Sequence, residues 1–391
     1  MLRERLRLSS QHREKKSNVF EYQMVHHCSV ASRLAFRTFT KVLRHATRSQ
    51  TRKYTGQSNL ASPRHLLSIK DLSPAEFSTL VLNASQHKFN KPTLCTDWKL
   101  RSALAGKVVA MLFSKKSTRT RVSTEGAAVA MGGHPMFLGK DDIQLGVNES
   151  LYDTSVVISN MVSCIVARVN AHKDVADLAK DSSVPVINAL CDKYHPMQII
   201  ADFLTMFETF AQTSSTHTSL ASALSGLKMA WIGDSNNVLF DMCIAARKTG
   251  VDISVATPKG YEIPASLKEI IKQAGDGVSS PGQITETNVP EEAVKNADVI
   301  VTDTWVSMGQ EEEKAKRIKA FAGFQVTSEL AKRGRAKDSW KFMHCLPRHQ
   351  EEVSDEVFYS PRSLVFPEAE NRLWAAITAL EGFVVNRGKI V

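Results

Sequence analysis

The sequence lacks long apolar runs, paired cysteines and the glycine-rich patterns of nucleotide sites. No stretch approaches the roughly 18 consecutive apolar residues that a membrane span requires. The six cysteines are scattered without a CxxC pair, which argues against a zinc site of usual spacing and against a disulfide scaffold. Neither GxGxxG nor GxxxxGKS/T occurs. We therefore expect a protein of a reducing compartment that has no membrane partner and no P-loop nucleotide site.

Acidic side chains are also missing from one long segment, since none occurs between Glu21 and Asp71. Residues 1–53 hold 13 lysines and arginines against three acidic residues, and this surplus accounts for the whole net charge of +10. On a helix, the basic side chains of residues 33–48 lie opposite the apolar ones. This pattern predicts a mitochondrial transit peptide over residues 1–54 and a location in the matrix, with a disordered or nucleic-acid-binding basic arm as the alternative. Because the remainder is neutral, we expect no nucleic-acid partner there.

The rest of the chain alternates short β-branched runs with helical stretches, which predicts an α/β fold of two similar-sized domains, each a parallel sheet flanked by helices. The first domain is expected over 62–205, completed by a C-terminal helix that returns to it within 368–391, and the second over 206–367. A Ser/Thr-rich stretch, TSSTHTSLASALSG, is expected to join them. The expected strands are 107–113, 162–167, 185–189, 227–233, 252–256 and 298–302, and the expected helices are 75–86, 118–131, 149–160, 172–180, 196–211, 237–249, 264–275, 311–320 and 369–387.

The stretch FSKKSTRTR, residues 113–121, lies where an apolar strand ends and a helix begins. A helix N-terminus offers free N–H groups and a positive dipole end to an anion. Hydroxyls of Ser117, Thr118 and Thr120 add donors, and Arg119 and Arg121 can bind phosphate oxygens in a bidentate manner. A capped helix with a solvated basic turn is the alternative interpretation.

Two other strand ends in this first domain carry polar residues. Arg168 ends the strand VSCIVAR, and His195 precedes Pro196 at the start of the next helix, where the dipole favours a neutral imidazole that can donate a hydrogen bond to a carbonyl oxygen. Taken singly, Arg168 could be an edge residue and His195 a simple cap. Because strand ends of a parallel sheet meet at one edge, Arg119, Arg168 and His195 together predict a site for a phosphate and a carbonyl group.

The second domain has similar candidates. WIGDSNN, residues 231–237, follows a strand, and its acid and two amides suit a zwitterionic amino acid better than a pyrophosphate. Asp303 ends another strand and could hold an ammonium group or cap a helix. Cys345 in HCLPR has no obvious partner for a nucleophilic triad, so a buried inert thiol is expected there.

Four motifs in this order, STRTR, HPMQ, DTWVSMG and HCLPR, resemble the transcarbamylase family, and the last two resemble its ornithine branch. The resemblance runs from about Ser62 to the C-terminus and implies transfer of a carbamoyl group from carbamoyl phosphate to the δ-amine of L-ornithine. It also implies a homotrimer with shared active sites and no metal or organic cofactor. The carbamoyl phosphate ligands it implies are Ser117, Thr118, Arg119, Thr120, Gln144 of a neighbouring subunit, Arg168, His195, Gln198, Cys345, Leu346 and Arg372. The ornithine ligands it implies are Asn237, Asp303, Ser307 and Met308.

The catalytic roles implied by the resemblance fall on Arg119, Arg168, His195, Asp303 and, as an assistant to Asp303, Cys345. Three other functions stay open from the sequence: a nucleotide-dependent oxidoreductase, which the missing GxGxxG disfavours, a non-catalytic protein that keeps the fold, and a carbamoyltransferase with another acceptor.

Overall fold

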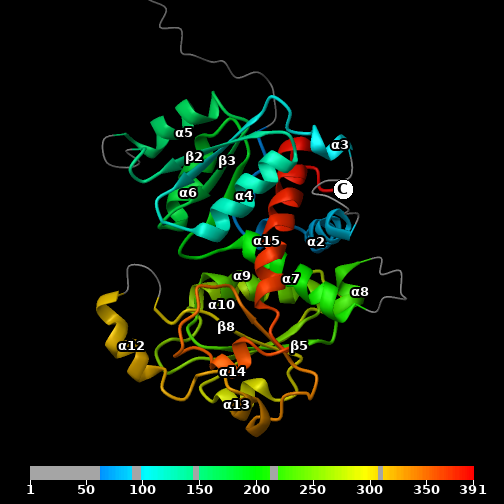
Figure 1. Ribbon diagram of the computed structural model, residues 1–391, viewed down its shortest axis with the longest axis vertical. Helices are drawn as coiled ribbons and strands as arrows, with labels where there is room; N and C mark the ends of the chain where they lie inside the picture. Colours follow the sequence, from blue (N-terminus) through cyan, green and yellow to red (C-terminus); the bar gives the residue numbers. More distant parts are fainter. Residues whose placement is uncertain (1–61, 90–97, 144–148, 212–218, 307–310) are drawn as a thin grey trace, which may run out of the picture. The chain divides into compact units, whose positions relative to one another are not determined.

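The computed structural model describes residues 62–89, 98–143, 149–211, 219–306 and 311–391 (Figure 1). The predicted transit peptide, residues 1–54, and the predicted ligands Gln144, Ser307 and Met308 lie outside the described residues. Within the described part, no helix is both long and apolar enough to cross a bilayer.

Two parallel sheets form the framework, as the sequence predicts. The first has the order β2-β1-β3-β4 and the second the order β7-β6-β5-β8-β9, and every neighbouring pair runs parallel. In both sheets the first strand in sequence lies inside, so that the connections run to either side of it and create the switch point at which such sheets bind ligands. The strands are β1 (Val108–Phe113), β2 (His134–Gly139), β3 (Cys164–Arg168), β4 (Val186–Leu190), β5 (Lys228–Ile232), β6 (Asp252–Ala256), β7 (Ile284–Thr287), β8 (Val299–Thr302) and β9 (Lys341–His344).

Helices flank both sheets, and the central strands β1, β3 and β5 are therefore buried and read as continuous apolar runs. The longer helices are α2 (Pro74–Phe89), α4 (Thr118–Ala130), α5 (Leu151–Ser159), α6 (His172–Asp181), α7 (Pro196–Phe210), α9 (Asn237–Thr249), α10 (Ala265–Gln273) and α15 (Val365–Leu380). The shorter ones are η1 (Ile69–Asp71), α3 (Trp98–Arg101), α8 (Leu220–Leu224), α11 (Pro290–Val294), η2 (Glu311–Glu313), α12 (Lys314–Ala320), α13 (Ser328–Arg333), α14 (Asp355–Phe358) and the π-turn η3 (Glu381–Val385).

Local chemistry fixes the helix starts that matter for the site. Ser117 caps α4 by accepting a hydrogen bond from the N–H of Thr120. Asn236 caps α9 by accepting from the N–H groups of residues 238 and 239, and Gly250 ends that helix in the left-handed conformation that glycine adopts most easily. Pro196 occupies the first turn of α7, with His195 as the residue before it, as predicted.

The last helix, α15, packs against α2, α4 and α7, which confirms that the C-terminal helix returns to the first sheet's helices (Figure 1). It begins at Val365 and ends at Leu380, earlier than the predicted 369–387 at both ends. Pro367 lies in its first turn, where a proline is tolerated because that turn's N–H groups have no partner within the helix.

Several short elements escape the sequence prediction. β2 contains Pro135 and ends at Gly139, two residues that normally argue against a strand, and it is accommodated because it lies at the edge of the sheet. β7 is likewise a short edge strand. The predicted linker is partly helical, because Ser219 caps α8 within it. The predicted helix 311–320 divides into η2 and α12.

Candidate active site

A cavity of about 720 Å³ opens between the carboxyl ends of the two sheets' strands and the helices that follow them. Most of the predicted ligands line it, which joins the four sequence motifs in one place. The predicted residues on its wall are Ser117, Thr118, Arg119, Thr120, Arg168, His195, Asn237, Asp303, Cys345, Leu346 and Arg372. Among the described residues of the prediction, Gln198 and Arg121 do not line the cavity, and the exposed Arg121 instead pairs with Glu125 at 2.9 Å.

The first wall is the start of α4, which presents hydroxyls and N–H groups. The Ser117 hydroxyl donates to the Thr120 hydroxyl oxygen at 3.0 Å, and an Nη of Arg372 donates to the same oxygen at 3.4 Å. With its oxygen occupied by two donors, the Thr120 hydroxyl keeps its own proton available for an acceptor in the cavity. Together with the free N–H groups of the helix, this arrangement suits an anion.

Three arginines gather beside this helix start. Arg168 and Arg372 are 7% and 3% exposed, and the pKa of each guanidinium is lowered to about 10. Burial is the main cause in both, and for Arg168 the charges of Arg372 and Arg119 add to it. The Nε atoms of Arg168 and Arg372 have no hydrogen-bond partner within the described residues. Such concentrated, under-compensated positive charge favours binding of a multivalent anion.

His195 lies deep in the cavity next to the arginines and is 4% exposed. Burial, and then the charges of Arg372, Arg168 and Arg119, hold the pKa of its imidazole well below the usual value. The ring is therefore neutral at pH 7, as predicted, although burial rather than the helix dipole is the main cause. Within the described residues its Nδ1 has no partner.

Gln198 belongs to a buried network behind the cavity. Its amide donates to Asp202 at 2.7 Å and to Glu368 at 3.0 Å, and its oxygen accepts from Arg372 at 2.6 Å. Burial raises the pKa of Asp202 to about 7, and burial together with the charge of Asp202 raises the pKa of Glu368 well above its usual value. The two acids hence share at least one proton and fix the orientation of Gln198. In the sequence, only the acid within the apolar stretch PMQIIADFLTMF signals this network.

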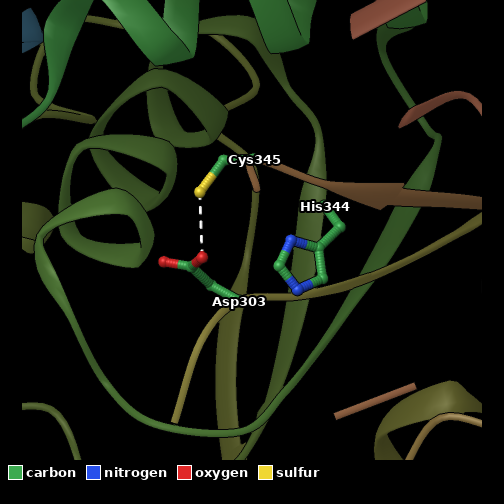
Figure 2. Close-up of side chains that lie close together, drawn as sticks. All are labelled: Asp303, His344 and Cys345. Atoms are coloured by element: carbon green, nitrogen blue, oxygen red, sulfur yellow. Dashed lines mark hydrogen bonds between the residues drawn. The ribbon is translucent and has the colours of Figure 1, made fainter. Parts of the chain in front are cut away.

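The second wall carries a carboxylate and a thiol. The thiol of Cys345 donates to Asp303 at 2.9 Å (Figure 2). The amide of Asn236 donates to the other oxygen of Asp303 at 2.7 Å. Burial raises the pKa values of Asp303 and Cys345, and the charge of Asp303 adds to the rise in the pKa of Cys345. The raised pKa is in line with the expected unreactive thiol, which stays a prediction, although Cys345 is partly exposed rather than buried. The pairing with Asp303, which the resemblance implied, is present.

His344 lies beside this pair, and the three side chains present ligand atoms within 4.8 Å of one another (Figure 2). Both nitrogens of the His344 ring are occupied, however. Nδ1 accepts the N–H of Leu346 at 2.9 Å, and Nε2 contacts Glu352 at 3.0 Å. A cation here would have to displace one of these bonds, so the arrangement is organised for hydrogen bonding rather than for metal binding.

The acid of WIGDSNN is not available for an ammonium group. Asp234 forms a buried ion pair with Arg317 at 2.8 Å, and Arg317 also donates to the carbonyl of Trp305 at 3.0 Å. Sequence reasoning missed Arg317 because it lies on α12, more than eighty residues later in the chain. Asn237 faces the cavity and donates to the carbonyl of Cys191 at 2.5 Å.

Comparison with known proteins identifies the family. The model described as "Aspartate/ornithine carbamoyltransferase, carbamoyl-P binding domain" matches residues 64–208, and the corresponding "Asp/Orn binding domain" model matches residues 225–381. The mitochondrial ornithine carbamoyltransferase of Emericella nidulans is 70% identical over 348 residues, covering 89% of this chain and 96% of the relative.

Solved structures agree. The crystal structure of the mitochondrial ornithine carbamoyltransferase from Coccidioides immitis has 69% identity and a TM-score of 0.78, covering 84% of this chain and all of that one. The ornithine carbamoyltransferase from Pyrococcus furiosus has 42% identity and a TM-score of 0.73, with coverage of 84% and 99%. With both domain models, the motifs and the cavity in agreement, the chain belongs to the aspartate/ornithine carbamoyltransferase family, in its ornithine carbamoyltransferase branch.

Proposed function

We propose that this protein transfers the carbamoyl group of carbamoyl phosphate to the δ-amine of L-ornithine, giving L-citrulline and phosphate, in the mitochondrial matrix. The observation that carries the proposal is the cavity with two chemically different walls: arginines, hydroxyls and free N–H groups on one, and the Asp303–Cys345 pair on the other. An anionic carbamoyl donor and a cationic amino-acid acceptor are the substrates that such walls complement.

Carbamoyl phosphate would bind the first wall. Its phosphate would accept hydrogen bonds from Ser117, Thr118, Thr120 and the start of α4, and Arg119 and Arg168 would neutralise its charge. Arg372, whose other Nη contacts Gln198, would help to hold the carbamoyl end. Because this donor brings its own leaving group, positioning and charge stabilisation are what the protein has to supply.

His195 would act on the carbonyl group. Its neutral imidazole can donate a hydrogen bond to the carbonyl oxygen as that oxygen gains negative charge, and Arg168 next to it would stabilise the same charge. Gln198, held by Asp202 and Glu368, would align the carbamoyl nitrogen through Arg372.

Ornithine would bind the second wall, with Asn237 and Asp303 facing its α-amino and carboxylate groups. By family resemblance, Ser307 and Met308, which lie outside the described residues, would complete the set. The δ-ammonium, an amine with a pKa of about 10.4, must lose a proton before it can attack. Exclusion of water from the cavity would lower that pKa, and the Asp303–Cys345 pair offers polar contacts to the amine.

In the reaction, the amine nitrogen donates its lone pair to the carbonyl carbon, so that a C–N bond forms and the carbonyl oxygen becomes an oxyanion. When the carbonyl reforms, the bond between the carbonyl carbon and the bridging oxygen of the phosphate breaks, and phosphate leaves with that electron pair. The nitrogen passes its remaining extra proton to the departing phosphate, and citrulline results.

A homotrimer with shared active sites is part of the proposal. Exposed large apolar side chains on the edge strand β2 and on helices α4 and α5 support it. These are Val122, Val129, Met136, Tyr152 and Val157. Gln144 of a neighbouring subunit would approach the phosphate by family resemblance. A molar mass of one chain by light scattering would exclude the trimer.

Two further points are part of the proposal. The domain limits are 62–205 with 368–391 for the first domain and 206–367 for the second, and the transit peptide covers residues 1–54. The acid-poor, Arg-rich composition supports the transit peptide. Its test is N-terminal sequencing of the protein from isolated mitochondria, where an intact residue 1 would exclude cleavage near Thr55.

The activity is tested by a citrulline colour assay on the chain from Thr55, with ornithine, aspartate and putrescine as alternative acceptors. Citrulline formation with ornithine is expected, and activity with aspartate alone would overturn the proposal. Arg119→Ala should raise the KM for carbamoyl phosphate by about a hundredfold through loss of charged hydrogen bonds. The matched control is Arg121→Ala on the same helix, since Arg121 is exposed and pairs with Glu125 at 2.9 Å. Equal effects of both would remove the assignment of Arg119.

A further inference from the structure

Asp241 is a carboxylate that neither the motifs nor the proposed chemistry uses. It lies on α9, one turn after Asn237, and is fully buried. One carboxylate oxygen accepts from the hydroxyl of Ser68 at 2.7 Å and from the N–H of Ile69 at 3.0 Å. The other accepts from the N–H of His195 at 2.9 Å. A buried acid with three donors in place is a strongly constrained group.

The position of the His195 ring depends on its main chain. The residue precedes α7 with φ −142° and ψ 62°, and its side chain makes no capping hydrogen bond. Its Nδ1 has no partner among the described residues. Its carbonyl accepts from the N–H groups of Gln198 and Ile199. The main-chain bonds therefore orient the imidazole, and Asp241 provides the one on the N–H side.

Helix α9 contacts the loop of His195 twice. Asn237, which lines the cavity, donates to the carbonyl of Cys191 at 2.5 Å, and Asp241, four residues later on the same face, accepts from the N–H of His195. The helix that opens the proposed ornithine wall is thus bonded to both ends of the loop that carries the proposed carbonyl-polarising residue. The turn at 68–69 is bonded to the same carboxylate.

We infer that Asp241 is a positioning residue for the transfer reaction, which holds the main chain of His195 so that its imidazole points at the carbonyl oxygen. This inference rests on the proposed function. Asp241 touches no substrate, and its effect on the rate passes through His195. The same contact ties the α9 side of the cavity to the carbamoyl phosphate side, so that a displacement of α9 would move the imidazole.

Among the described residues, Asp71, Tyr194 and Lys248 are the titratable side chains that interact with Asp241. Lys248 lies on the same face of α9 and donates to the carbonyls of Lys70 and Leu72. It therefore grips the same turn as Asp241 without reaching the loop of His195, which makes Lys248→Met a matched control.

Asp241→Asn is the informative change because it keeps the shape and removes one acceptor. An amide has one oxygen, so its NH₂ group must face either the N–H of His195 or the N–H of Ile69. Either orientation places two donors against each other and displaces one of the two main-chain segments, at His195 or at Ile69. Asp241→Glu is the second variant, which keeps both acceptors and moves them by one methylene, and it serves if Asp241→Asn does not fold.

The first experiment measures kcat and both KM values by citrulline formation for the wild type, Asp241→Asn, His195→Ala and the double variant. Asp241→Asn should lower kcat by about tenfold or more, as a misplaced group does. In the His195→Ala background, the same change should lower kcat by less than about twofold. Lys248→Met should keep the wild-type kcat. Equal effects of Asp241→Asn in both backgrounds would overturn the inference, because the residue would then act through the fold and not through His195.

The second experiment does not need activity. In protein labelled at histidine, the His195 ring signal is assigned in NMR spectra by its loss in His195→Gln. Asp241→Asn should shift this signal, whereas Lys248→Met should leave it at the wild-type position. An unmoved His195 signal in folded Asp241→Asn would overturn the inference. A wild type that forms no citrulline would instead remove the proposed function, while this measurement would still decide whether Asp241 positions the ring.

Discussion

Without an anion to neutralise it, the arginine cluster should weaken the fold, and replacing Arg168 by methionine should therefore stabilise the ligand-free protein while it destroys anion binding. Arg168 ends β3 with its side chain almost fully buried, and its charge interacts with those of Arg372 and Arg119. Its Nε has no partner within the described residues. Methionine keeps much of the aliphatic length and packs without a charge.

The size of the effect follows from the guanidinium's environment. The pKa of Arg168 is lowered from its usual value to about 10, mainly by burial and then by the charges of Arg372 and Arg119. At 1.36 kcal/mol for each pKa unit, this corresponds to about 3 kcal/mol of destabilisation of the charged form in the folded chain. A gain of up to about 3 kcal/mol in the free energy of unfolding is thus expected for Arg168→Met, reduced by imperfect packing of the new side chain.

Urea unfolding of the wild type and Arg168→Met, with and without saturating phosphate, measures this directly. Without ligand, the variant should have the higher midpoint at an unchanged slope. Phosphate at about a hundred times its Kd should stabilise the wild type by about 2.7 kcal/mol and the variant by far less. A variant that is less stable than the wild type without ligand, or one that gains as much from phosphate, would refute the view that the cluster stores repulsion which the anion relieves.

Three further changes have defined outcomes. Arg317→Met should leave the buried charge of Asp234 unpaired and lower the free energy of unfolding by about 3 kcal/mol, whereas an unchanged urea midpoint would mean that the pair contributes nothing. Burial raises the pKa of Asp241 to about 7, so the carboxylate that accepts all three hydrogen bonds prevails above pH 7, whereas below it the folded chain keeps a proton that the unfolded chain loses above about pH 4. Stability from this group should fall by about 1.4 kcal/mol per pH unit up to pH 7, and Asp241→Asn should flatten that decline. Because the pKa of the Cys345 thiol is raised, iodoacetamide should modify it far more slowly at pH 8 than a free thiol, and rapid modification that ornithine prevents would contradict the hydrogen bond to Asp303.

The first-sheet half of the site was predictable because strand ends are visible in the sequence. Buried parallel strands appear as apolar runs in the sequence, and the residues that follow these runs lie at one common edge of the sheet. This pattern alone predicts that Arg119, Arg168 and His195 lie close together. The order of the strands within the two sheets was harder to predict. Short edge strands such as β2 and β7 have weak patterns, since one face and one edge lack the partners that make a strand read as apolar.

Residues that act through tertiary pairing were not predictable in the same way. Asp202, Glu368 and Arg317 meet partners far away in the chain, and nothing in their local sequence identifies those partners. The lowered pKa of His195 is a similar case, because a helix start predicts the direction and only the packed structure supplies burial as its main cause. Gln198 was predicted as a ligand, and its bonds to that buried network, which keep it off the cavity wall, could not be foreseen.

The return of α15 to the first sheet has a consequence for the order in which the protein becomes competent. Arg372 and Glu368 both lie on this helix, the last long one in the chain, yet they contact Thr120 and Gln198, which are made roughly 170 to 250 residues earlier. A nascent or partly imported chain therefore holds the proposed anion-binding start of α4 and His195 without the arginine that completes them. The proposed anion site is complete only when α15 docks, so that anion binding would distinguish a finished polypeptide from an unfinished one.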